Sequence, residues 1–263
     1  MGWKALLWDV DGTLAETEFH GHRQAFNQAF RDAGLPWCWD GATYRQLLAI
    51  SGGRERIRHF LELHQKGPVS DNLVESLMGA KQEAYATLAR SGELPLRPGV
   101  KRVVSEVARH GLPQALVTTS SRSAVAALLE GHGQGLADAF AFWICGEDVK
   151  MKKPSPEGYQ LALNRLNLAS TEVLALEDSP QGLAAARGAC LPCLLTLGDE
   201  AVGGGQAVGP EASPWWQAAR AAVNHLGDDQ RPTKVFQGPS CQDGRVTLSW
   251  LQRLVVREWA DLR

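Results

Sequence analysis

Short apolar runs alternate with helical patterns along most of this 263-residue chain. A short apolar run bounded by turn residues predicts a buried strand, and apolar positions three or four residues apart predict an amphipathic helix. The strands predicted in this way cover residues 5–8, 114–118, 140–145, 173–176, 192–197 and, more weakly, 221–226. The helices predicted between them cover residues 100–110, 123–131, 157–166 and 181–187. This alternation predicts an α/β fold whose parallel sheet is covered by helices on both faces.

A block of helical pattern without a strand signal follows the first strand. Apolar side chains such as Phe26 and Phe30 recur at helical spacing from about residue 16 until Gly34 ends the first helix. Further helices are predicted at residues 44–49, 55–64 and 71–90, the last with Ser70 as its N-cap. We therefore expect an all-helical insertion of about 75 residues within the α/β core.

The C-terminal part of the chain gives weaker signals. Leucines at helical spacing in residues 248–262 predict a helix that docks on the core. A glycine-rich stretch with a tryptophan pair, residues 203–216, and a polar connector, residues 227–244, receive no predicted role. Core filling is the expected role of the tryptophans, while an exposed interaction patch at Trp215 and Trp216 stays an alternative.

Composition and charge narrow the class of protein. The chain has 27 Lys and Arg against 29 Asp and Glu, so its formal charge of -2 favours neither nucleic acid nor an anionic membrane as a partner. No apolar stretch approaches the ~20 residues of a membrane-spanning helix, and the first apolar run is too short for a signal peptide. Five cysteines at irregular spacings fit reduced thiols. We therefore expect a soluble, cytoplasmic monomer.

Two motifs that suggest metal binding favour structural roles instead. Cys190 and Cys193 have the C-x-x-C spacing of redox and metal sites, but no second cysteine pair accompanies them. His20 and His22 lie two residues apart near the start of the helical insertion, where a hinge or surface role is favoured over metal binding.

Two carboxylates stand directly after the first predicted strand. Asp9 and Asp11 are two residues apart, so the period of the strand places both on one side, and Gly12 lets the backbone turn away sharply. One carboxylate can act as a nucleophile on phosphorus and the other as a general acid and base, with Mg²⁺ neutralising the charge between them. A surface turn or a calcium-loop fragment has the same pattern, so this segment alone leaves both interpretations open.

Two further loops of the core carry residues suited to holding phosphate. Thr119 and Ser120 follow the second core strand, where hydroxyls and backbone N–H groups can bind phosphate oxygens, although a helix N-cap is the alternative. Lys153 lies in a loop that Pro154 and Pro156 make rigid, which presents a fixed positive charge. A solvated lysine cluster is the alternative there.

A second acidic pair, Glu177 and Asp178, ends the strand predicted at residues 173–176. Carboxylate oxygens are the ligands that Mg²⁺ prefers, and this pair suits the completion of an octahedral site. Because the chemistry of parallel sheets lies at the carboxyl ends of the strands, we expect the four segments to converge there.

The ordered set of these segments resembles the four motifs of the haloacid dehalogenase superfamily over about residues 4–200. The resemblance implies a Rossmann-like core, residues 1–15 and 97–230, interrupted by a helical cap, residues 16–96. Residues 231–263 are then a C-terminal extension with a helix.

The same resemblance implies a role for each motif. Asp9 attacks phosphorus and forms an aspartyl-phosphate, and Asp11 protonates the leaving oxygen and then activates the hydrolytic water. Thr119 and Lys153 hold the transferring phosphoryl group. The implied Mg²⁺ ligands are the Asp9 side chain, the Asp11 backbone carbonyl and the side chain of Asp178, with Glu177 in support.

A narrower resemblance lies in residues 9–18, 22–27 and 51–56, which look like the CbbY-type sugar-bisphosphate phosphatases that act on xylulose 1,5-bisphosphate. It implies that Glu18 contacts sugar hydroxyls and that one loop binds the distal phosphate. The substrate-binding residues of that loop are Gly52, Gly53, Arg54, Glu55 and Arg56. Glycines allow close backbone approach, and arginines can grip a phosphate dianion bidentately.

The leading hypothesis is a Mg²⁺-dependent phosphatase that hydrolyses a phosphorylated sugar, with xylulose 1,5-bisphosphate as the expected substrate. A β-phosphoglucomutase-like phosphotransferase would use the same core residues and return the phosphoryl group to a sugar. A non-catalytic sugar-phosphate-binding protein is the alternative from another class, although a pure binder has little need of Asp11 as a proton carrier.

Overall fold

The computed structural model describes residues 3–50, 52–65, 67–198, 214–241 and 243–256. Two compact units make up the chain. The first unit takes its residues from 1–15, 96–118 and 138–263, and the second from 16–95 and 119–137. The chain therefore leaves the first unit twice and returns to it twice.

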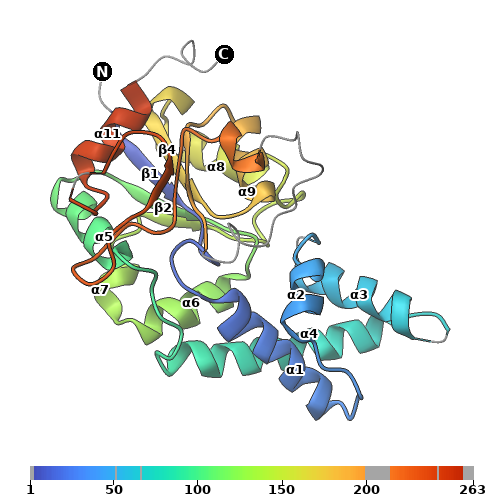
Figure 1. Cartoon of the computed structure of the whole chain (residues 1–263). Helices are drawn as coiled ribbons and strands as arrows, with labels where there is room; N and C mark the ends of the chain where they lie inside the picture. The colour runs from blue at the N-terminus through green and yellow to red at the C-terminus, as the bar shows by residue number, and fades with distance from the viewer. Residues whose placement is uncertain (1–2, 51, 66, 199–213, 242, 257–263) are drawn as a thin grey trace. The chain divides into compact units, whose positions relative to one another are not determined.

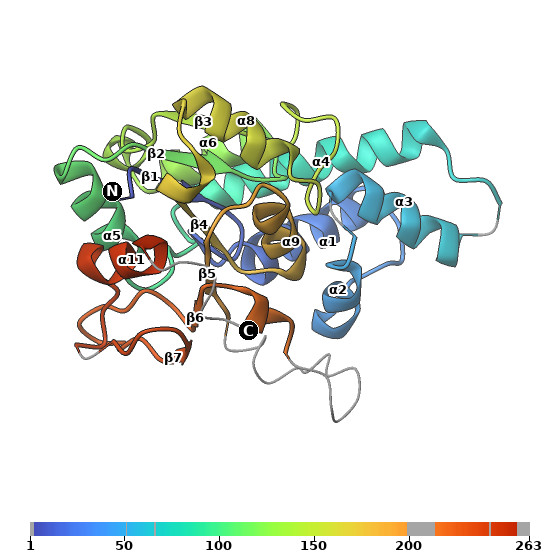
Figure 2. The same ribbon diagram turned by 90° about the horizontal axis from the view of Figure 1, so that it is seen from above.

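The first unit is built on a seven-stranded sheet in the order β3-β2-β1-β4-β5-β6-β7 (Figure 2). The strands are β1 (Ala5–Trp8), β2 (Gln114–Val117), β3 (Phe142–Ile144), β4 (Val173–Glu177), β5 (Cys193–Thr196), β6 (Ala221–Val223) and β7 (Val235–Gln237). All neighbours pair in parallel except β7, which runs antiparallel to β6. Leu7 of the central β1 lies opposite Ala115 on one side and Ala175 on the other. The predicted parallel α/β sheet is confirmed.

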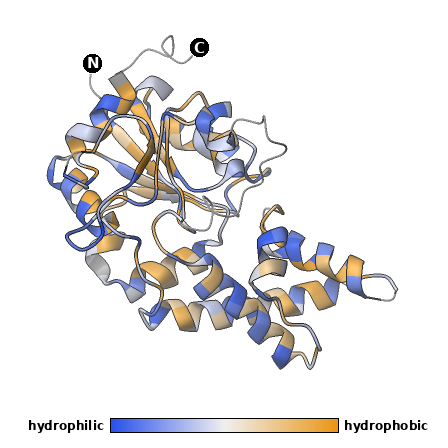
Figure 3. Cartoon of the chain, viewed as in Figure 1, coloured by the Kyte–Doolittle hydropathy of each residue, from blue (hydrophilic) through white to orange (hydrophobic). Residues whose placement is uncertain are grey.

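Helices cover both faces of this sheet (Figure 1). Those of the first unit are α5 (Val100–Arg109), α8 (Glu157–Leu166), α9 (Pro180–Gly188) and α11 (Leu248–Val256), with the 3₁₀ turns η2 (Ser170–Glu172) and η3 (Trp215–Ala218). Helices α8 and α9 lie on one face, and α5 and α11 lie on the other. Figure 3 draws the strands mostly in the hydrophobic colour, which agrees with the complete burial of β1, β2, β4 and β5. Burial on both faces explains why these strands are continuous apolar runs.

The second unit contains helices only, among its described residues. They are the π-helical turn η1 (Glu18–His22), α1 (Arg23–Asp32), α2 (Gly41–Leu47), α3 (Gly53–His64), α4 (Asp71–Arg90), α6 (Arg122–Gly131) and α7 (Gln134–Ala137). Its core is aromatic: Phe26 and Phe30 on α1 pack around Trp39, with Phe60 of α3 also in ring contact. Ser70 precedes α4 as predicted, but its side chain makes no capping hydrogen bond.

Two details differ from the sequence-based expectations, and a third agrees with one of them. The connector at residues 227–244 contains β7, and residues 231–256 belong to the first unit rather than to a separate extension. Residues 119–137, expected in the core, group with the helical unit. Trp215 and Trp216 are half-buried against the core of the first unit, which agrees with the expected core-filling role and not with the alternative of an exposed patch. Most of the glycine-rich stretch lies outside the described residues.

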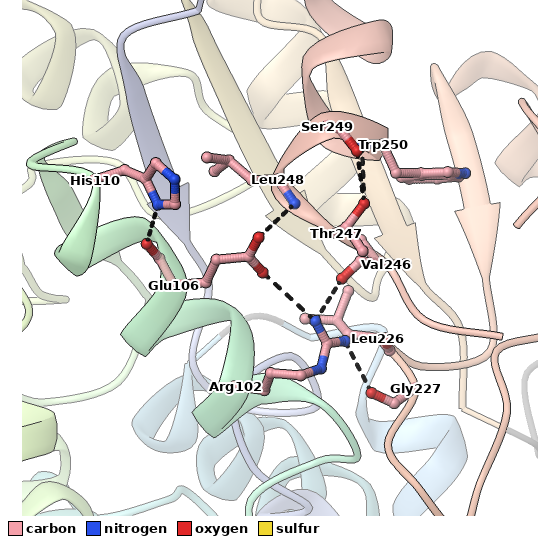
Figure 4. A network of polar contacts seen from close by, with 10 residues as sticks. All are labelled: Arg102, Glu106, His110, Leu226, Gly227, Val246, Thr247, Leu248, Ser249 and Trp250. Carbon is pink, nitrogen blue, oxygen red and sulfur yellow. Dashed lines mark hydrogen bonds and ion pairs between the residues drawn. The ribbon is translucent and has the colours of Figure 1, made fainter. Parts of the chain in front are cut away.

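The C-terminal segment is fastened to α5 through Arg102 and Glu106 (Figure 4). Arg102 donates hydrogen bonds of 2.9 Å to the backbone oxygens of Leu226 and Val246. Glu106, one turn further along α5, accepts a hydrogen bond of 3.3 Å from the backbone N–H of Leu248 at the start of α11. These bonds join residues more than 100 positions apart, which explains why the sequence pattern alone places this segment poorly.

Two expectations from composition, on membrane-spanning segments and on cysteines, can be compared with the described residues. None of their helices combines the length and the apolar character needed to cross a membrane. The five cysteines are free thiols, and Cys193 is buried within β5 whereas Cys190 is exposed.

Candidate active site

Both acidic pairs lie at the carboxyl edge of the sheet in the first unit. Asp9 follows β1 and Glu177 ends β4, and these strands are neighbours with Trp8 paired to Leu176. The backbone N–H of Asp9 donates a 3.0 Å hydrogen bond to the oxygen of Leu176. Two adjacent parallel strands therefore end together and place their terminal carboxylates side by side, as the convergence argument predicts.

Lys153 connects the two acidic pairs. Its Nζ atom lies 2.6 Å from Oδ1 of Asp9, 2.6 Å from Oε1 of Glu177 and 2.7 Å from the backbone oxygen of Val117. A lysine ammonium has three N–H donors, and each has an acceptor here. The Lys153 side chain is buried, so the alternative of a solvated lysine cluster does not apply to this residue.

Burial and charge act in opposite directions on the two partners. Burial raises the pKa of Asp9 to about 8, Lys153 opposes that rise, and Glu177 and Asp11 add to it. Burial lowers the pKa of Lys153, but Asp9 and Glu177 more than reverse this and leave it above its ordinary value. The site therefore has more carboxylate charge than one ammonium balances.

The donor set of the site fits a divalent cation. Asp9, Glu177 and Asp178 each offer a carboxylate oxygen, and these oxygens lie within 4.8 Å of one another. The buried Oε2 atom of Glu177 has no hydrogen-bond partner. Oxygen-only donors with excess negative charge suit Mg²⁺ or Ca²⁺. The side chain of Asp11 is not part of this cluster, and the resemblance assigns only its backbone carbonyl to the metal.

Gly12 explains how the first acidic loop approaches the second. Its φ angle is +82°, and a β-carbon there would overlap the carboxylate of Asp178. Only glycine combines the left-handed backbone with this close approach. Asp11, just before it, is partly exposed and pairs as an isolated bridge with Ala15, so its carboxylate is less enclosed than that of Asp9.

Tyr159 is a site residue that the sequence analysis missed. Its hydroxyl donates a 2.6 Å hydrogen bond to Oε1 of Glu177, and its ring is completely buried. Burial and the nearby carboxylates of Glu177 and Asp9 raise the pKa of Tyr159 well above its ordinary value, so the hydroxyl stays a donor. The signal in the sequence was a side chain that ends in a hydroxyl on the buried face of α8, six residues after Lys153.

Thr119 and Ser120 come directly after Thr118, whose backbone N–H donates a 3.0 Å hydrogen bond to the oxygen of Ile144. Ser121 is the N-cap of α6, because its Oγ accepts a 3.3 Å hydrogen bond from the N–H of Ala124. Ser121 therefore fills the capping role that was the alternative for this segment. Thr119 and Ser120 begin the part of the chain that groups with the second unit.

The second unit contains a polar cluster around Tyr44. The Tyr44 hydroxyl donates a 2.6 Å hydrogen bond to Oε2 of Glu18 and accepts one of 2.9 Å from Nη1 of Arg56. Glu18 is partly exposed, so its carboxylate is both oriented by Tyr44 and open to solvent. Such an oriented carboxylate is suited to accept hydrogen bonds from sugar hydroxyls.

Residues 53–56 form the first turn of α3 rather than the expected loop, and the two predicted phosphate arginines differ in their surroundings there. Arg56 is buried, with Nε bonded to the oxygen of Leu47 at 3.0 Å and Nη2 bonded to that of Ile50 at 3.1 Å. These two bonds and the one from Nη1 to Tyr44 use three of its five N–H donors within the unit, which favours a structural role for Arg56 over the predicted phosphate contact. Arg54 is half-exposed and forms a surface ion pair with Glu75, so its guanidinium can exchange partners. Glu55 is exposed as well.

The two histidines take different positions. His22 is buried, stacks on Tyr85 at 4.2 Å between ring centroids, and lies 2.9 Å through Nδ1 from Nζ of Lys81. His20 is exposed. Neither belongs to the cluster of possible metal ligands among the described residues.

Comparisons with known proteins agree with this geometry. The family model of haloacid dehalogenase-like hydrolases matches residues 3–189. The chain belongs to this family. It is therefore an enzyme, a phosphatase of the hydrolase class, as the sequence predicts.

Likeness to CbbY proteins is more specific. Protein CbbY of Cereibacter sphaeroides is 43% identical over 196 residues, which are 74% of this chain and 84% of that protein. The plasmid-encoded protein CbbY of Cupriavidus necator is 37% identical over 234 residues, 87% of this chain and 88% of that protein. A crystal structure of a CbbY mutant from Rhodobacter sphaeroides, in complex with xylulose 1,5-bisphosphate, is 43% identical with a TM-score of 0.70 and covers 74% of this chain and 87% of that one.

Proposed function

We propose that this enzyme is a Mg²⁺-dependent sugar phosphatase that hydrolyses xylulose 1,5-bisphosphate through an aspartyl-phosphate on Asp9. The observation that carries the proposal is the buried ammonium of Lys153, which lies 2.6 Å from Asp9 beside a cluster of metal-ligating carboxylates. The CbbY likeness supports the choice of substrate, because a relative of this sequence identity was crystallised with that bisphosphate.

Each core residue has a role that its position suits. Asp9 supplies the nucleophilic oxygen, since its carboxylate is held in one orientation by Lys153. The ammonium can turn one N–H from Asp9 to a phosphoryl oxygen while its bonds to Glu177 and Val117 hold it in place. Asp11 is more accessible than Asp9, which suits a group that gives a proton to the leaving sugar oxygen and takes one from water.

The metal site completes the electrostatics of the core. The side chains of Asp9, Asp178 and Glu177 and the backbone carbonyl of Asp11 would hold Mg²⁺. The ion would neutralise the phosphoryl oxygens as the nucleophile approaches. The hydroxyls of Thr119 and Ser120 are assigned to the same phosphoryl group.

The helical unit is assigned substrate recognition. Glu18 would accept hydrogen bonds from sugar hydroxyls, and its orientation depends on the 2.6 Å hydrogen bond from Tyr44. The backbone of Gly52 and Gly53 and the side chains of Arg54 and Glu55 would form the distal phosphate site. Arg56 holds the start of α3 from inside the unit and does not touch the phosphate in this proposal. A cytoplasmic monomer is also part of the proposal.

The deciding experiment measures phosphate release with Mg²⁺ across a substrate panel. The panel contains both epimeric pentulose 1,5-bisphosphates, phosphorylated hexoses and simple monophosphates. We expect the highest kcat/KM with xylulose 1,5-bisphosphate and no release by an Asp9→Asn variant, while Asp138→Asn, at an exposed position, keeps full activity.

Two outcomes would overturn parts of the proposal. Interconversion of sugar monophosphates with little free phosphate would make the enzyme a phosphotransferase. An Asp9→Asn variant that releases phosphate at the wild-type rate would exclude the covalent mechanism.

A further inference from the structure

A buried arginine of the first unit is bound to the loop that carries Asp11. Arg97 is 5% exposed and lies directly after the first return of the chain from the helical unit. Its Nη1 donates hydrogen bonds to the backbone oxygens of Gly12 and Thr196, and its Nη2 donates to those of Asn224 and Leu197. A buried guanidinium is costly unless its N–H groups are satisfied, and here four backbone oxygens accept from it.

Two of the four acceptors, Gly12 and Thr196, are directly connected to the acidic site. Gly12 follows Asp11 in the loop after β1. Thr196 ends β5, and its Oγ1 donates a 3.4 Å hydrogen bond to the backbone oxygen of Glu177. One hydrogen bond therefore connects the Arg97 guanidinium to the first acidic loop, at Gly12. Two hydrogen bonds in succession, through Thr196, connect it to the backbone of Glu177.

The backbone around Arg97 holds the same loop from its other end. The N–H of Arg97 donates a 2.9 Å hydrogen bond to the oxygen of Leu14, and Leu96 pairs with Ala15 in an antiparallel bridge. The loop is closed on itself by a 2.9 Å hydrogen bond from the N–H of Gly12 to the oxygen of Ala15. Side chain and backbone together thus fasten residues 12–15.

We propose that Arg97 is a positioning residue of the active site, which keeps the Asp9–Thr13 loop in register with the end of β4. This inference rests on the proposed function. Arginine is required because the Nη1 and Nη2 atoms of its planar fork reach three separate segments at once. The three donors of a lysine radiate from one nitrogen and cannot span the same acceptors.

Arg102 provides the comparison that separates positioning from stability. It lies five residues further along the chain, is partly buried, and also donates to backbone oxygens of the C-terminal half, those of Leu226, Gly227 and Val246. None of those acceptors belongs to the segments that carry Asp9, Asp11, Glu177 and Asp178. A merely structural arginine should behave as Arg102 does.

The test compares Arg97→Lys with Arg102→Lys in the full-length enzyme. A small misplacement of reacting groups greatly slows the chemical step. We therefore expect Arg97→Lys to lower kcat about 10- to 100-fold with KM changed less than about threefold. Arg102→Lys should lower Tm by a similar amount and leave kcat unchanged. An equal fall of kcat in both variants, or an unchanged kcat in a folded Arg97→Lys protein, would overturn the proposal.

Hydrogen exchange tests the same proposal without any turnover. Backbone amides in residues 9–16 should exchange faster in Arg97→Lys than in Arg102→Lys, whereas amides of β2 should be equal in the two. Unchanged protection of residues 9–16 would contradict the positioning role even where the wild-type protein released no phosphate. Failure of the proposed function would instead appear as an inactive wild type with normal protection differences between the variants.

Discussion

The hydroxyl of Tyr159 donates to the same carboxylate oxygen of Glu177 that lies 2.6 Å from Nζ of Lys153. The phenol of Tyr159 on α8 thereby fixes one oxygen of the buried Glu177 carboxylate, and that carboxylate fixes the ammonium next to Asp9. A β-carbon on Gly182 would overlap the Glu177 carboxylate, so the packing of α9 also restricts it. The orientation of Lys153 therefore depends on residues outside the family motifs.

The first prediction concerns the phenol. Tyr159→Phe keeps the buried ring and removes the hydroxyl, which leaves Glu177 freer to rotate. Because a hydrogen bond to a charged group contributes roughly 1.5–3 kcal/mol, we expect kcat to fall about 10-fold or more with little change in KM. Steady-state kinetics with the best sugar phosphate measures this, and a kcat equal to wild type would exclude the orienting role.

The second prediction makes the same chemical change in the helical unit. Tyr44→Phe removes the hydroxyl that lies between Glu18 and Arg56. Because Glu18 is assigned to the sugar and not to the phosphoryl group, we expect KM to rise several-fold with kcat nearly unchanged. Tyr159→Phe should therefore lower mainly kcat, whereas Tyr44→Phe should raise mainly KM. A fall of kcat alone in Tyr44→Phe would contradict the division of roles.

The order of strands and helices could be predicted because both are driven by burial. Strands β1, β2 and β4 are buried on both faces and appear as apolar runs, and the ring-filled core of the second unit appears as helical spacing. Strand β7 was missed because it has three half-buried residues at the edge of the sheet. Three residues are too few to show an alternation of apolar and polar positions, so their sequence pattern cannot be told from that of a polar connector.

The candidate site could be predicted only as far as its residues follow strand ends. The acidic pairs are adjacent to apolar runs, so their convergence follows from parallel pairing. Tyr159 and Arg97 contact partners 18 and 85 positions away, and no local pattern indicates such contacts. Arg54 and Arg56 look equivalent in sequence, and only the packing of α3 buries one and exposes the other.

The third prediction uses the titration of Asp9 in the absence of metal. Burial raises the pKa of Asp9 to about 8, whereas its ordinary value is 3.8. Between these values the folded chain binds a proton that the unfolded chain releases, so the free energy of unfolding falls as pH rises, by up to about 1.4 kcal/mol per pH unit. Above about pH 8 this contribution is constant.

Thermal unfolding from pH 4.5 to 8.5 checks that sign. With EDTA, Tm should fall more steeply with rising pH in the wild type than in Asp9→Asn, which cannot ionise at that position. Saturating Mg²⁺ should reduce the difference, because the ion binds the ionised carboxylates and not the protonated form. Parallel Tm profiles of the two proteins in EDTA would show that Asp9 ionises in its ordinary range.

The fourth prediction separates the exposed arginine from its neighbours. Arg54→Ala should raise KM about 10-fold or more for a sugar bisphosphate and much less for the matching monophosphate, because a charge-assisted bond to the distal phosphate is lost. Arg58→Ala is the matched control, since Arg58 is also an α3 arginine in a surface ion pair, with Asp71. Equal losses on both substrates would place the distal phosphate elsewhere.

The fifth prediction concerns the C-terminal segment and separates stability from catalysis. Arg102→Met keeps the apolar stem but removes the guanidinium that binds the oxygens of Leu226 and Val246. Leaving such acceptors without donors costs about 1–3 kcal/mol each, so we expect Tm to fall by roughly 5–10 °C. Arg109→Met, on the same helix and exposed, should leave Tm unchanged. Differential scanning calorimetry decides this, and equal Tm values for the two variants would mean that the network in Figure 4 contributes little to holding residues 226–256 on α5.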